Sequence, residues 1–124
     1  MDEQIIFFFA KMPQALPLYQ AFARQMQARF EGYTVKVQKT QISFSNKYNF
    51  AFVSLPYRKI KGRPDVYIIV SFGLSHKVDD PRISVSVEPY PNRWTHHVIV
   101  QNADEIDAQL MAWIAEAYSF SMFK

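Results

Sequence analysis

Basic side chains concentrate in the second quarter of this 124-residue chain, where they could bind an anion. Residues 32–64 hold seven Lys or Arg and no acidic residue, whereas residues 65–124 hold four basic and eight acidic ones. A guanidinium can hold a phosphate through two parallel hydrogen bonds, and a neighbouring aromatic ring offers a stacking surface. We therefore expect one continuous anion-binding surface, formed by Lys36, Lys39, Tyr57, Arg58, Lys59, Lys61 and Arg63.

A second interpretation of this segment is a solvated basic loop whose charge is offset by the acidic C-terminal half. The net charge of +3 favours this interpretation, because dedicated nucleic-acid-binding proteins usually carry more positive charge. Salt-dependent binding of a polyanion would distinguish the two.

The histidines and acidic clusters do not form a recognisable catalytic or metal motif. His96 and His97 are adjacent on a predicted strand, so their rings point to opposite faces and cannot easily share a metal ion. We expect His96 to pack at the edge of the core and His97 to face outward. The chain has no Cys, and its three Gly are too few for a phosphate-binding loop. We therefore predict no metal, no cofactor and no assignable catalytic residue.

Helical spacing of apolar residues marks both ends of the chain, at about residues 2–30 and 103–120. Asp2 can cap a short first helix that Pro13 ends, and a second helix is expected from about Ala15 to Phe30. Asn102 can cap the last helix, with Asp104 and Glu105 in its first turn.

A hydrophobic period of two predicts short strands between about residues 33 and 100, interrupted by loops at 56–64 and 73–81. Helices at the two ends of a run of strands indicate an α+β fold. We expect one domain over residues 1–124, with two layers. A mostly antiparallel sheet of about six strands, connected as a meander, carries the N-terminal and C-terminal helices on one face.

The same alternation assigns side chains to the two faces of the sheet, because a shift of one residue would exchange them. We expect the helix-facing side chains to be Val35, Val37, Ile42, Phe44, Phe50, Phe52, Ile83, Val85 and Val87. The opposite, polar face is a possible ligand surface and is expected to carry Gln38, Ser43, Ser84, Ser86 and His97.

Several stretches of the sequence carry a family resemblance. They are residues 37–44 followed by 50–53, residues 71–74, and residues 94–97 together with 105–107 and 116–118. In this order they resemble a bacterial domain of unknown function, the family numbered 5655, from about Pro17 to Tyr118. The family has no established activity. Its occurrence both alone and appended to larger proteins implies a binding module more than an enzyme.

These observations predict a small cytoplasmic binding or accessory module for an anionic ligand, either nucleic acid or a phosphorylated molecule. The alternative is a protein-interaction or dimerisation domain, and an enzyme of unknown type comes third. The N-terminus is acidic, unlike that of a signal peptide, and the longest apolar run is far below the ~20 residues of a membrane span. We therefore expect no membrane partner.

Overall fold

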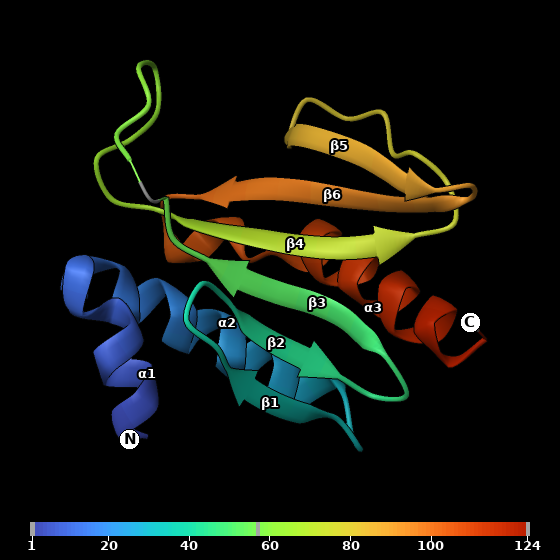
Figure 1. Ribbon diagram of the computed structural model, residues 1–124, viewed down its shortest axis with the longest axis horizontal. Coiled ribbons are helices and arrows are strands. Elements are labelled where there is room, and N and C mark those ends of the chain that lie inside the picture. Colours follow the sequence, from blue (N-terminus) through green and yellow to red (C-terminus); the bar gives the residue numbers. More distant parts are fainter. Residues whose placement is uncertain (1, 57, 124) are drawn as a thin grey trace.

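The computed structural model describes residues 2–56 and 58–123 and contains a six-stranded antiparallel sheet with helices packed against it (Figure 1). The predicted α+β class is confirmed. The helical elements are α1 (Glu3–Phe8), α2 (Leu16–Arg29), α3 (Ala108–Met122) and three 3-10 turns (Phe9–Lys11, Pro13–Ala15 and Ala103–Glu105). The strands are β1 (Thr34–Val37), β2 (Ile42–Ser45), β3 (Asn49–Ser54), β4 (Ile68–Leu74), β5 (Ile83–Tyr90) and β6 (Arg93–Val100).

The strand order is β1-β2-β3-β4-β6-β5, so the prediction of a simple meander is wrong for the last two strands. Tyr90 pairs with Arg93 around a tight turn, in which Asn92 has a φ of 60°. Asn adopts this left-handed conformation more readily than most residues. Strand β6 takes the place beside β4 because it carries the buried Val98 and Val100, whereas the more polar β5 lies at the exposed edge.

The last helix begins later than the sequence pattern predicts. Asn102 and Glu105 form a capping box, but around the 3-10 turn Ala103–Glu105. The backbone leaves the helical conformation at Ile106, and the carboxylate of Asp107 then caps α3 by accepting a hydrogen bond of 3.0 Å from Leu110 N–H. The prediction missed this second cap because one continuous amphipathic pattern covers both elements.

The core lies between the sheet and the helices. Helix α3 packs on β3 and β4, while α2 reaches β2 through an edge-on contact between the rings of Phe22 and Phe44. The side chains of Ile68, Val70, Phe72 and Leu74 on β4 are completely buried on this face. Strand β4 therefore forms the centre of the hydrophobic core.

A β-bulge in β3 changes which phenylalanines face the helices. Phe44 pairs with Ala51 but Ser45 pairs with Asn49, so Phe50 is an extra residue on β3. Phe50 packs against Phe30 and Tyr118 on the helix side, as predicted. The alternation restarts after the bulge, and Phe52 lies on the opposite face, where its ring meets His97. The prediction that Phe52 faces the helices is therefore wrong.

A second bulge in β5 has the same effect. Ile83 pairs with Val98 and Val85 with His97, so Ser84 is the extra residue. Ile83 packs against the core as predicted. Val85 and Val87 instead lie on the face of the sheet opposite the helices, here called the open face, and are 43% and 48% exposed. Ser86 pairs with His96 and moves to the helix side. The predictions for Val85, Ser86 and Val87 are therefore wrong, because they assume a strict alternation of faces, which an inserted residue reverses.

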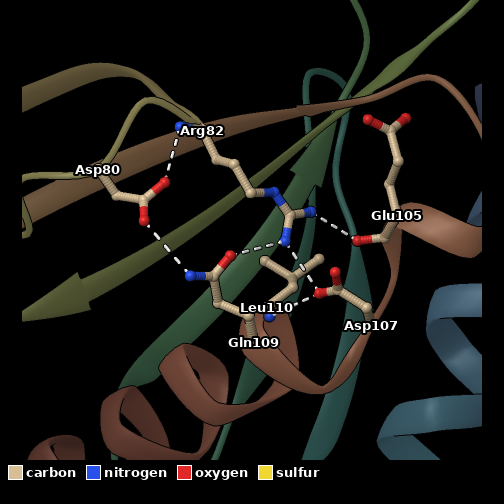
Figure 2. A network of polar contacts seen from close by, with 6 residues as sticks. All are labelled: Asp80, Arg82, Glu105, Asp107, Gln109 and Leu110. Carbon is tan, nitrogen blue, oxygen red and sulfur yellow. Dashed lines mark hydrogen bonds and ion pairs between the residues drawn. The ribbon is translucent and has the colours of Figure 1, made fainter.

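Arg82 ties the start of β5 to the start of α3 (Figure 2). Its guanidinium donates hydrogen bonds to the Asp107 carboxylate at 2.9 Å, the Gln109 side chain at 3.2 Å and the Glu105 carbonyl at 2.6 Å. Burial alone would raise the pKa of Asp107, but the hydrogen bonds from Leu110 N–H and Arg82 outweigh it and hold this pKa below its usual value.

We expect Arg82→Ala to lower the free energy of unfolding by about 1–3 kcal/mol, because it leaves the Glu105 carbonyl and the Asp107 carboxylate without these partners. Urea unfolding at neutral pH measures the change. Arg24→Ala, which removes an exposed arginine from α2, is the control and should change stability by less than about 0.5 kcal/mol. Equal effects of the two substitutions would contradict a structural role for Arg82.

Candidate functional site

A hollow of about 560 Å³ opens beside the end of the sheet where β3 leaves it and β4 enters. Helix α1, the β1–β2 turn and the β3–β4 loop all lie at this end, on the left in Figure 1. The described lining residues are Phe8, Lys11, Lys39, Thr40, Ser54, Leu55, Pro56, Arg58, Ile60, Arg63, Ile69, Ser84, Val85 and His97. A volume of this size is typical of sites for small organic molecules, which span roughly 300–1,000 Å³.

Local turn geometry places the side chains around the hollow. Gln38 N–H donates to the Gln41 carbonyl at 2.8 Å, which closes a turn with Lys39 and Thr40 at its tip. In the β3–β4 loop, Arg63 N–H donates to the Ile60 carbonyl at 3.2 Å. Gly62 has a φ of +88° within this turn, a conformation that side-chain-bearing residues rarely adopt.

The charge of the hollow is uniformly basic. Lys11, Lys39, Arg58 and Arg63 line it, and none of the described lining residues is acidic. Four cations of one sign around a partly enclosed, low-dielectric space focus a positive potential and attract an anion. Sequence reasoning missed Lys11, since it stands alone at the end of the N-terminal helical segment, remote from the basic block.

The structure divides the predicted anion-binding residues into two groups. Lys39, Arg58 and Arg63 line the hollow. Lys36, Lys59 and Lys61 are exposed and are not among its lining residues. Lys59 lies 3.4 Å from Asp65, but both side chains are more than 80% exposed, so this pair is weak. Tyr57 lies outside the described residues.

The predicted polar face is also divided. Ser43 is buried and donates to the Gln38 side chain at 2.8 Å, and neither residue is among the lining residues of the hollow. Ser84 and His97 do line the hollow, and the Ser84 hydroxyl donates to the His97 carbonyl at 3.0 Å. Ser86 is absent from this face because of the bulge at Ser84.

One row of side chains crosses the open face through all six strands, formed by the successive register partners Lys36, Ser43, Phe52, Ser71, His97 and Val85. Ser71 lies near its centre and is completely buried. Its Oγ is 2.6 Å from Nδ1 of His97. Sequence reasoning did not select Ser71, although a serine within the apolar run from Val66 to Phe72 was a visible signal.

The two adjacent histidines lie on opposite faces, as the alternation predicts. The buried ring of His96 stacks on Phe72, and its Nε2 accepts a hydrogen bond of 2.9 Å from Val78 N–H. Burial lowers the pKa of His96 and that of His97. In contrast, a hydrogen bond with Glu116 raises the pKa of His76.

A cluster of metal ligands or a membrane-spanning helix would each indicate a different kind of function. No group of three or more His, Cys, Asp or Glu among the described residues is arranged to hold a metal ion. No helix in residues 2–56 and 58–123 is long and apolar enough to cross a bilayer.

The chain matches a family model over residues 7–121, with the description "Domain of unknown function (DUF5655)". It belongs to the DUF5655 family. The matched range includes every described lining residue of the hollow, from Phe8 to His97. No curated protein and no solved structure matches the chain. The family description names no activity for DUF5655.

We expect the free energy of unfolding to fall as pH drops below about 6.5, the ordinary pKa of histidine. His96 and His97 have depressed pKa values, so the unfolded chain takes up protons there at a higher pH than the folded chain does. His76, with its raised pKa, opposes this effect. His76→Gln should therefore steepen the loss. Urea unfolding between neutral and mildly acidic pH measures both slopes, and stability that rises on acidification would contradict the prediction.

Proposed function

We propose that this DUF5655 chain is a cytoplasmic binding module that holds a small anionic molecule, such as a phosphorylated metabolite, in the hollow at the end of the sheet. The observation that carries the proposal is the convergence of Lys11, Lys39, Arg58 and Arg63 on one hollow whose described lining residues include no acidic side chain. These side chains come from three separate segments of the chain. Cations that converge on one hollow focus a positive potential there, which attracts an anion.

The apolar part of the lining supports a ligand with an organic body. Phe8, Leu55, Ile60, Ile69 and Val85 contribute hydrophobic walls between the charged groups. Small-molecule sites commonly combine apolar walls with a few polar groups that set orientation. A bare inorganic anion would leave these walls in contact with water, so an anionic group on an apolar or aromatic body fits the lining better.

A small ligand also accounts better than nucleic acid for the distribution of charge. A polyanion bound along the surface would use the exposed Lys36, Lys59 and Lys61 as well as the hollow, because its affinity grows with each neutralised phosphate. A ligand confined to the hollow needs only the cations that line it.

We expect Arg58→Ala combined with Arg63→Ala to weaken binding of uridine 5′-monophosphate by about tenfold or more, because charge-assisted hydrogen bonds are the strong ones. Lys59→Ala combined with Lys61→Ala removes the same charge from the same loop but outside the hollow, and should change the affinity less than about twofold. Isothermal titration calorimetry at low salt measures both variants.

The two double variants also separate the ligand classes. If a short oligothymidine binds and both variants weaken it equally, with a steep salt dependence, nucleic acid replaces the small anion as the ligand. If neither probe binds to the parent chain at low salt, the anion-binding function is refuted.

Self-association through β5 is a second candidate function. Strand β5 is an edge strand of eight residues, and Val85, Val87 and Tyr90 are exposed on it. Unprotected edge strands can pair with another copy of the same strand.

We expect a dimer, if β5 forms one, to dissociate when Val87→Lys places a charge on the exposed edge. Sedimentation equilibrium over a range of concentrations measures the mass. Thr34→Lys, which adds the same charge to the opposite edge strand β1, is the control and should leave the mass unchanged. A monomeric mass for the parent chain at all concentrations would exclude this candidate.

A further inference from the structure

The contact between Ser71 and His97 constrains which nitrogen of the imidazole ring carries the proton. Ser71 is completely buried in the middle of β4, and its Oγ lies 2.6 Å from Nδ1 of His97 on the neighbouring strand β6. Among the described residues, this is the single hydrogen bond made by the Ser71 hydroxyl.

A buried hydroxyl donor without an acceptor costs free energy, about 1–3 kcal/mol. If Nδ1 carried the proton, it would donate to Oγ and leave the Ser71 O–H with no acceptor among the described groups. If Nδ1 is unprotonated, the Ser71 O–H donates to it and both groups are satisfied. A neutral ring in this arrangement carries its proton on Nε2.

The ring is held in place from two further directions. The ring of Phe52 meets the imidazole edge-on, with ring centroids 6.3 Å apart. The Ser84 hydroxyl donates a hydrogen bond of 3.0 Å to the backbone carbonyl of His97. The half-buried side chain of His97 lines the hollow, and Nε2 has no hydrogen-bond partner among the described residues. Nε2–H of His97 is therefore a donor that no described residue uses, on a ring in the lining of the hollow whose position is constrained by these contacts.

The hollow is also divided into two chemically different parts. The cations come from the N-terminal helical segment, the β1–β2 turn and the β3–β4 loop. His97 belongs instead to the sheet, where its cross-strand partner Val85 and the β4 residue Ile69 supply the apolar surface. A ligand that fills the hollow would place its anionic group at the loops and its uncharged body on the sheet.

We propose that His97, held in its Nε2–H form by Ser71, is a specificity-determining residue that donates a hydrogen bond to an acceptor atom on the uncharged body of the ligand. This inference rests on the proposed function. It narrows the ligand to an organic phosphate or similar anion whose body carries an exposed carbonyl or ring nitrogen, the chemistry of a nucleotide base. Ser71 acts through His97 and is a positioning residue.

Burial keeps this donor neutral, because it lowers the pKa of the ring. No described lining residue of the hollow is acidic, so the lining supplies no carboxylate that would stabilise a proton added to His97. Protonation at Nδ1 would also prevent the Ser71 hydroxyl from donating its hydrogen bond to this nitrogen. His97 therefore recognises an acceptor atom rather than a negative charge.

The first test needs no ligand. Long-range proton–nitrogen NMR correlation of the ¹⁵N-labelled full chain distinguishes the two neutral forms of each histidine. We expect His97 in the Nε2–H form, and a mixture of both forms in Ser71→Ala, where Nδ1 has lost its donor. A parent chain with the proton on Nδ1, or a Ser71→Ala spectrum identical to the parent's, would overturn the assignment.

The second test measures affinity for uridine 5′-monophosphate and for inorganic phosphate. The variant is Ser71→Ala combined with His97→Phe, because replacing both partners by apolar groups leaves no unsatisfied hydroxyl. We expect about a fivefold loss for the nucleotide and no change for inorganic phosphate, with an unfolding temperature close to the parent's. Ser71→Ala alone, which keeps Nε2, should lose less.

The outcomes separate the two levels of the argument. If the parent binds both probes and the double variant binds the nucleotide equally well, the role of His97 is overturned and the anion site stands. If binding of both probes falls together in the double variant, His97 has no role in specificity. If the parent binds neither probe, the proposed function is overturned, and the ligand contact of His97 with it.

Discussion

The burial of the centre of β4 on both of its faces is the constraint on which the rest of the structure depends. Ile68, Val70, Phe72 and Leu74 fill the helix side completely, and Ser71 is equally buried on the other side. A serine at such a position needs a hydrogen-bond partner from an adjacent strand. Strand β6 supplies it through His97 Nδ1, and the same strand supplies Val98 and Val100 to the core. These two requirements place β6 beside β4, and β5 therefore lies at the edge of the sheet.

The elements of the fold were predictable because their signals are local. Asp2 caps α1 as expected, and α2 ends one residue before the predicted Phe30. The faces were not fully predictable, because each bulge inserts one residue and reverses the alternation after it. Nothing in the sequence around Phe50 or Ser84 announces the insertion. Phe50 is placed by its packing against Phe30 and Tyr118, and these contacts join residues that are far apart in the chain.

The candidate site, like the faces of the sheet, was predictable only in part. Lys39, Arg58 and Arg63 belong to one basic block, which composition alone reveals, and they meet in the hollow. Ser84 and His97 were expected on the polar face of the sheet, and both line the hollow. Lys11 and Ser71 were not selected, because they join the site through helix packing and strand pairing, which depend on tertiary structure. Lys59 and Lys61 belong to the same block but lie outside the lining, because a charge pattern along the chain does not say which side of a loop faces the sheet.

The bulge at Ser84 has a consequence for the hollow that a regular strand would not have. In an unbroken alternation that begins at Ile83, Val85 would face the helices, and Ser84 and Ser86 would both face outward. On the β5 side of His97, the sheet would then offer polar side chains instead of an apolar wall. The inserted residue instead places Val85 next to His97 and lets Ser84 hold the His97 carbonyl. The irregularity in β5 thus supplies both the wall and one of the anchors of the histidine, in keeping with the frequent occurrence of bulges beside functional sites.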